Sequence, residues 1–204
     1  MVFRLLSVIC FIFAFTPSAK AQVAEVKIGI TEFAEDTLGI GWAVSAPRSL
    51  IDGERLPQPE NSVAINAEIV FAEPEFLKWA LSPQPYINGT LNLEGETSFG
   101  GAGLLWRQTL GTKFYGDFSI GLVAHTGATG LPDDVGFIEA VRLSQTEIQF
   151  GSRILFRPHF ALGYKVNEKW SGEIFFEHLS NGSIFSSRVN EGVDNIGVKA
   201  ARRF

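Results

Sequence analysis

Apolar and polar positions alternate along much of the chain. In "VAINAEIVF" (63–71), valine, isoleucine and phenylalanine share one parity, while asparagine and glutamate share the other. Segments 84–95 and 114–125 repeat this period of two. Because successive side chains of a strand point to opposite faces, each segment predicts a β-strand with one apolar face and one polar or small face.

The pattern predicts eight strands, near residues 24–33, 61–72, 84–95, 101–110, 114–125, 150–165, 169–181 and 194–204. After the N-terminal region, no segment has 18 consecutive apolar residues, so a membrane-spanning helix is not expected. Segments of about ten alternating residues separated by turns are typical of a transmembrane β-barrel. A soluble sandwich has the same period, with its apolar faces buried inward.

The end of the chain favours the barrel. The segment "DNIGVKAARRF" ends in Phe204, which resembles the aromatic C-terminus of bacterial outer-membrane barrels. Opposite their apolar residues, the strand near 169–181 carries Glu173 and Glu177, and the strand near 194–204 carries Lys199 and Arg203. Inside a narrow barrel, these opposite charges can pair. We therefore predict an all-β fold, an eight-stranded antiparallel transmembrane β-barrel with a filled lumen.

The first 21 residues have the pattern of a secretory signal peptide. Arg4 precedes the apolar run "LLSVICFIFAF", and Ala-Lys-Ala at 19–21 gives a small-residue cleavage site. The run is too short to span a bilayer as a helix, although a retained interfacial anchor is the alternative. We expect residues 1–21 to be the signal peptide and residues 22–204 to form a single outer-membrane barrel domain.

Charge and cysteine content exclude several classes of partner and site. Without the predicted leader, 15 basic and 22 acidic residues remain, a net charge of −7. An acidic chain with no basic run argues against nucleic acid as a partner. The one cysteine of the sequence, Cys10, lies in the leader, so neither a disulfide nor a cysteine-ligated metal is expected in the mature chain.

The predicted strands also set the loops. With both termini in the periplasm, segments 34–60, 126–149 and 182–193 become extracellular loops, and "GTK" and "VNEK" become short periplasmic turns. Segment 37–45 could form a ninth strand. We assign it to the first loop because an odd count would leave the termini on opposite sides. The connection at 73–83 is longer than periplasmic turns usually are.

A histidine and a serine stand two residues apart near the outer end of the 169–181 strand. His178 and Ser180 share the apolar, lipid-facing parity of that strand, and Asp194 has the same parity on the returning strand. Polar groups facing lipid are costly unless they are paired. Together, these three are the nucleophile, base and orienting acid of acyl transfer, and the position predicts a lipid as acyl donor. A polar pair at headgroup level without catalytic role is the alternative.

The other two histidines point elsewhere. His125 and His159 fall on the inward parity of their strands, so we expect each to be a hydrogen-bonded residue of the lumen.

Two motifs resemble a known family. The segments "HLSNG" (178–182) and "NEGVDNIGV" (190–198) are similar to those of the lipid A 3-O-deacylase (PagL) family of outer-membrane barrels. That family shows His-x-Ser-Asn near the top of the seventh strand and Asn-x-Gly-x-acid opening the eighth. A weaker resemblance extends through 150–166 and 85–98. It implies a bacterial outer-membrane enzyme that hydrolyses the ester-linked 3-hydroxyacyl chain at position 3 of lipid A, without a metal or other cofactor.

The resemblance also implies residue roles. Ser180 would be the nucleophile, His178 the base and Asp194 the acid. The turn and oxyanion-stabilising groups would be Asn181, Gly182 and Asn190. The family's acid is expected to be glutamate, and Asp194 is one methylene shorter. Glu191 is the alternative acid, although its parity points inward.

The expected partners are lipopolysaccharide, as the lipid A substrate, and the lipid of the outer membrane. Two other functions fit the same residues. One is a catalytically silent barrel with a structural or adhesion role, and the other is a phospholipase with the same triad. The oligomeric state stays open, with a homodimer as one alternative.

Overall fold

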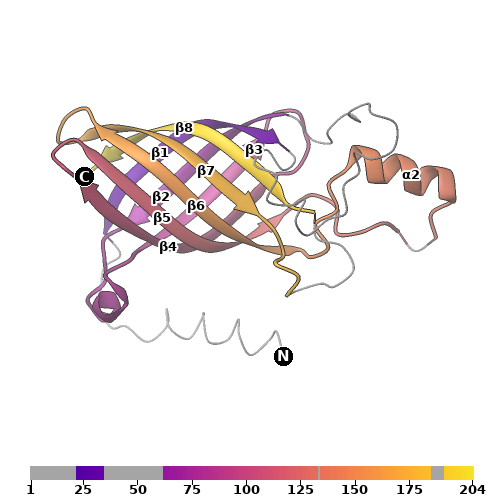
Figure 1. The fold of residues 1–204 in the computed structure, drawn as a ribbon, viewed down its shortest axis with the longest axis horizontal. Helices are drawn as coiled ribbons and strands as arrows, with labels where there is room; N and C mark the ends of the chain where they lie inside the picture. Colours follow the sequence, from indigo (N-terminus) through magenta and orange to yellow (C-terminus); the bar gives the residue numbers. More distant parts are fainter. Residues whose placement is uncertain (1–21, 35–61, 133, 185–190) are drawn as a thin grey trace.

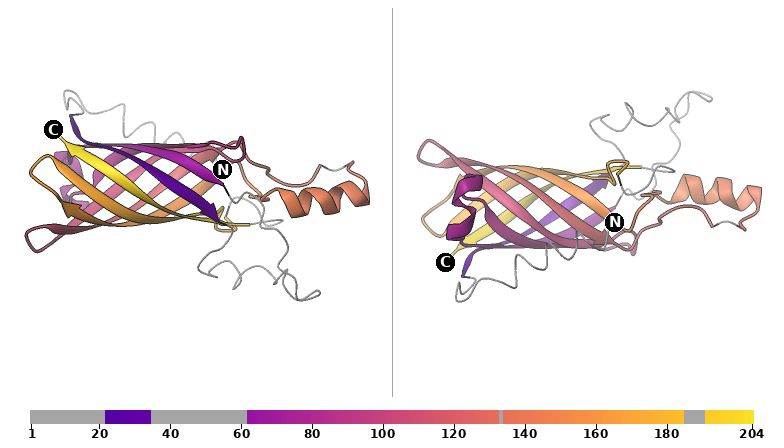
Figure 2. Two further views of the ribbon diagram at one scale, coloured as in Figure 1. Left: turned by 90° about the horizontal axis from the view of Figure 1, so that it is seen from above. Right: turned by 90° about the horizontal axis from the view of Figure 1, so that it is seen from below.

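The computed structural model describes residues 22–34, 62–132, 134–184 and 191–204. They form eight strands: β1 (Val23–Ala34), β2 (Val63–Phe71), β3 (Gln84–Asn92), β4 (Phe99–Leu110), β5 (Phe114–His125), β6 (Ile154–Lys165), β7 (Trp170–Leu179) and β8 (Val193–Arg203). Each strand pairs antiparallel with the next, and β8 pairs with β1, which closes the barrel (Figures 1 and 2).

The eight predicted strands are all present, and the prediction for β5 has the observed bounds. The predicted signal peptide (residues 1–21) and segment 37–45 lie outside the described residues. Two short helices were not predicted: the 3₁₀ helix η3 (Glu75–Ala80) between β2 and β3, and α2 (Phe137–Thr146) between β5 and β6. Among the described residues, neither helix is long and apolar enough to cross a bilayer.

The two ends of the barrel differ. The turn end holds the short connections 111–113 and 166–169 together with Phe204, whereas the loop end holds the connections that follow β5 and β7 (Figure 1). Helix α2 extends from the loop end away from the barrel in all three views (Figures 1 and 2). Short turns at one end and longer loops at the other are the usual asymmetry of outer-membrane barrels.

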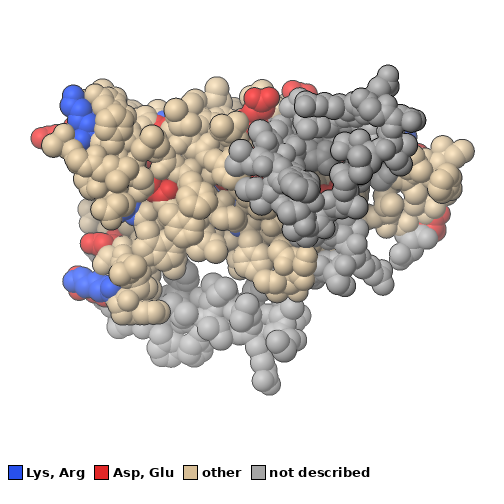
Figure 3. Space-filling view, in the orientation of Figure 1, with Lys and Arg blue, Asp and Glu red and all other residues tan. Residues whose placement is uncertain are grey.

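The wall has an apolar outer face and a polar inner face, as the parity of β7 and β8 predicted. Ile174 and Val198 are exposed on the outside, while Glu173 and Lys199, one residue away, are buried inside. Where the wall is not covered in Figure 3, it is mostly uncharged, and the charged side chains gather toward the turn end. An exposed apolar belt of this kind is suited to lipid.

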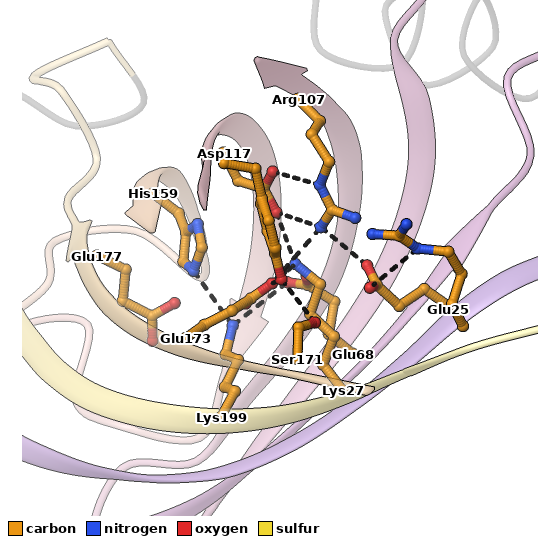
Figure 4. Close-up of polar contacts among 12 residues, drawn as sticks. Glu25, Lys27, Glu68, Arg107, Asp117, His159, Ser171, Glu173, Glu177 and Lys199 are labelled. Atoms are coloured by element: carbon orange, nitrogen blue, oxygen red, sulfur yellow. Dashed lines mark hydrogen bonds and ion pairs between the residues drawn. The ribbon is translucent and has the colours of Figure 1, made fainter. Parts of the chain in front are cut away.

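The interior is held together by a network of buried ion pairs (Figure 4). Lys27 Nζ lies 2.9 Å from an Asp117 carboxylate oxygen and 3.0 Å from one of Glu173. Further members of the network are Glu25, Glu68, Arg107, Arg157, Glu177 and Lys199. A buried charge is tolerated when opposite charges and hydrogen bonds surround it, which is the situation of Lys27.

An apolar plug fills the lumen at the loop end. Its buried members are Ala64, Phe99, Val123, Ile148, Phe150, Leu155, Leu179 and Val193. The segment after α2 supplies Ile148 and Phe150, and backbone hydrogen bonds hold this segment in place. Phe150 N donates to Ala128 O (3.0 Å), and Glu191 N donates to Gln149 O (3.1 Å). The plug therefore supports the ends of β7 and β8 from within.

Candidate active site

His178 and Asp194 are joined by a short hydrogen bond on the outer wall. Antiparallel pairing of β7 and β8 places the two residues directly opposite each other. His178 Nδ1 lies 2.6 Å from Asp194 Oδ1. Because a carboxylate only accepts, Nδ1 carries the proton in this bond, and Nε2 of the neutral ring is left as an acceptor. The cross-strand position lets the aspartate reach the ring without the extra methylene of a glutamate.

Asp194 is more deeply buried than His178. The Asp194 side chain is 1 % exposed, whereas that of His178 is 21 % exposed. A charge-assisted bond shielded from water is stronger than one in bulk solvent. The imidazole is thus held in one orientation by Asp194 and remains partly exposed on the outer wall.

Gly192 provides the space into which the imidazole fits. A Cβ atom at this position would lie 2.6 Å from His178 Cε1 and 3.2 Å from Nε2. Non-bonded carbon atoms pack at about 3.5–4.0 Å, so any larger residue would push the ring away. This role of Gly192 was not predicted from the sequence, although Gly192 is the glycine of the Asn-x-Gly-x-acid motif and stands two residues before Asp194.

Ser180 lies on the same face of the wall as His178. Its backbone continues β7 by one bridge to Phe156, with N–H···O distances of 2.7 and 3.2 Å. Ser180 is half-buried, two residues beyond the histidine. Within the described part of the chain, no hydrogen bond joins the Ser180 hydroxyl to the imidazole. Such bonds are often long in an unliganded site and tighten when substrate binds.

The turn after Ser180 is attached to the apolar plug. Asn181 is buried; its Nδ2 donates to Phe150 O (2.7 Å), and its Oδ1 accepts from Ser183 N (2.6 Å). Gly182 has a φ of 60°, in the left-handed region that favours glycine. The side chain of Asn181 therefore shapes the turn. Asn190 lies outside the described residues.

Glu191, the alternative acid, contacts the backbone of the segment after α2. Its Oε2 accepts from the backbone N–H of Gln149 at 2.7 Å. The carboxylate therefore fastens the segment after α2 to the start of β8. This long-range contact had no signal in the local pattern of the sequence.

The remaining histidines lie in the interior, as predicted. His159 Nε2 accepts from Lys199 Nζ (3.1 Å), and its ring stacks on Phe175. His125 Nε2 lies 2.7 Å from Ser152 O. Both imidazoles are buried within the barrel, away from the outer wall.

Comparison with known proteins identifies the family. A family model described as "Lipid A 3-O-deacylase (PagL)" matches residues 75–203, which include both motifs of the site. The chain belongs to the lipid A 3-O-deacylase (PagL) family. It is therefore a barrel of the bacterial outer membrane from a family of hydrolases. A search of curated protein sequences found no match.

Solved structures agree on the fold. The crystal structure of the outer membrane enzyme PagL superposes with a TM-score of 0.56 at 10 % identity, covering 89 % of this chain and all of that one. The crystal structure of Neisserial surface protein A superposes with a TM-score of 0.53 at 7 % identity, covering 88 % of this chain and 96 % of that one. At such low identity, the two likenesses show the architecture alone.

Proposed function

We propose that this barrel is a serine esterase that removes the ester-linked 3-hydroxyacyl chain at position 3 of lipid A in lipopolysaccharide. The observation that carries the proposal is the 2.6 Å bond between His178 Nδ1 and Asp194 Oδ1 on the lipid-facing wall, with Ser180 on the same face. Membership of the lipid A 3-O-deacylase family supports the same substrate. A phospholipase would use the same three residues on a different ester.

In the proposed reaction, Ser180 Oγ attacks the ester carbonyl carbon while His178 Nε2 takes the hydroxyl proton. The tetrahedral intermediate collapses, and the imidazolium gives this proton to the leaving sugar oxygen. Water, activated by the same imidazole, then hydrolyses the acyl-enzyme and releases the 3-hydroxy fatty acid. Asp194 holds the ring in the required tautomer and stabilises the imidazolium that forms in each half-reaction.

The oxyanion that forms on the ester carbonyl needs hydrogen-bond donors. Because the Asn181 amide is bound to Phe150 O, we assign this role to backbone N–H groups of the 181–182 turn, together with Asn190. Removing one donor of this kind typically lowers turnover by about 10²–10³-fold.

The position on the wall explains how the substrate is held. With both termini in the periplasm, the loop end faces outward, so the site lies at the level of the outer leaflet. Lipid A is then already in the membrane beside the barrel, with its acyl chains against the apolar belt. Diffusion within the leaflet then delivers the ester to Ser180.

The test is an assay of the folded protein with lipopolysaccharide, in which free 3-hydroxy fatty acid is measured. Ser180→Ala and His178→Ala should abolish its release while the barrel still folds. Asp134→Asn, an exposed aspartate in the loop before α2, is the control for changes away from the site. Full activity in either site variant would refute the proposed roles, and release from glycerophospholipids alone would show a phospholipase.

A further inference from the structure

The connection between β2 and β3 carries an exposed apolar surface at the turn end. Phe76, Trp79 and Leu81 are 44 %, 84 % and 85 % exposed, and no residue of η3 is buried. In Figure 1, η3 is the purple coil below the left end of the barrel, displaced sideways from the wall. Three large apolar side chains so close together are unusual on a surface that faces water.

Helix η3 is attached to the lipid-facing wall. Trp106 Nε1 donates to Ala80 O at 2.9 Å, which binds the last turn of η3 to β4. The Trp106 ring stacks on Phe118, with centroids 5.9 Å apart, and Phe118 contacts Phe160 at 5.1 Å. Phe118 and Phe160 are exposed on the outer wall. The apolar surface of η3 therefore continues an aromatic band that faces the membrane.

The periodicity of η3 separates its apolar and charged side chains. In a 3₁₀ helix, residues three apart lie above one another. Phe76 and Trp79 form one such column, and Glu75 and Lys78 form another, joined by a 2.6 Å ion pair. An aromatic column beside an exposed pair of charges is suited to a membrane interface, where the rings enter the lipid and the charges stay at the headgroups.

The backbone that follows η3 turns Leu81 outward. Leu81 and Ser82 have φ angles of 65° and 52°, a left-handed conformation that is unfavourable for residues with a Cβ atom. Leu81 nevertheless remains 85 % exposed. Burial of the Leu81 side chain in lipid is favourable and would offset the cost of this backbone conformation. Contact of the same side chain with water would not offset it.

We propose that η3 and Leu81 form an interfacial anchor that inserts Phe76, Trp79 and Leu81 into the periplasmic leaflet of the outer membrane. The occupant of this surface is phospholipid, because the surface is continuous with the wall that already faces lipid. The anchor fixes the depth of the barrel and is independent of the proposed hydrolysis.

Spin labelling tests the proposal. In a background in which Cys10 is replaced by alanine, a nitroxide is attached at Leu81→Cys, and the protein is folded into phosphatidylethanolamine–phosphatidylglycerol vesicles. Power saturation compares collisions with oxygen, which concentrates in the bilayer, and with a water-soluble nickel chelate. Leu162→Cys on the outer wall is the lipid control, and Glu168→Cys in the β6–β7 turn is the aqueous control.

The expected result is an oxygen-to-nickel accessibility ratio at position 81 close to that at position 162. A ratio close to that at position 168 would overturn the anchor and place the surface in the periplasm. Low accessibility to both reagents would also overturn it, because it would indicate a protein contact such as a second copy of the chain. The same comparison at Trp79→Cys keeps the test valid if one substitution disturbs folding.

Discussion

Substitution of Gly192 by alanine tests whether catalysis depends on the placement of the imidazole. The new Cβ would lie 2.6 Å from His178 Cε1. To restore a contact of about 3.5 Å, the ring must move by roughly 1 Å. That movement disturbs the 2.6 Å bond to Asp194 and displaces Nε2, the atom that takes the proton in the proposed reaction.

The expected loss follows from this displacement. A misplacement of about 1 Å can lower the rate by about 10²-fold, so we expect kcat to fall about 100-fold. This corresponds to about 2.7 kcal/mol in the activation free energy. We expect KM to change much less, because Gly192 acts through His178.

The assay measures initial rates of 3-hydroxy fatty acid release over a range of lipopolysaccharide concentrations. Gly172→Ala is the matched control: Gly172 is on the same strand as His178, faces outward, and has no atom within 4 Å of an added Cβ. It should retain the activity of the unmodified protein. A Gly192→Ala protein with unchanged kcat would refute the account of how the ring is positioned.

Three further substitutions test separate parts of the structure. Asp194→Asn should lower kcat by about 10³–10⁴-fold in the same assay, because the amide no longer fixes the tautomer; normal turnover would remove the acid from the mechanism. Glu191→Gln should leave turnover nearly unchanged, because its amide oxygen can still accept from Gln149 N, whereas a large loss would make Glu191 the acid. Lys27→Met should lower the free energy of unfolding in urea by about 3–5 kcal/mol, because three buried carboxylates lose their shared cation. The exposed Lys169→Met should change it by less than about 0.5 kcal/mol, and equal stabilities would show that the network contributes nothing.

The barrel could be predicted because its constraints are local. A strand between lipid and a filled lumen must alternate, so the parity of Glu173, Ile174, Val198 and Lys199 correctly indicated which face is buried. The same rule placed His178 and Asp194 on the outer wall, and the strand register then brought them into contact.

Other features depend on contacts that the local pattern does not contain. The alternation rule carries no information about connections, so α2 and η3 were missed. The hydrogen bond from Asn181 Nδ2 to Phe150 O joins residues 31 positions apart. It depends on where the segment after α2 packs at the loop end of the barrel. The close approach of Gly192 to the His178 ring depends on the pairing of β7 with β8, which the local pattern does not contain.

Mass spectrometry of lipid A tests the central claim most directly. Cells that produce the unmodified protein are compared with cells that produce Ser180→Ala at the same level of folded barrel. We predict that lipid A from the first cells alone loses the mass of one 3-hydroxyacyl chain. Identical lipid A spectra from the two would contradict the proposed hydrolysis.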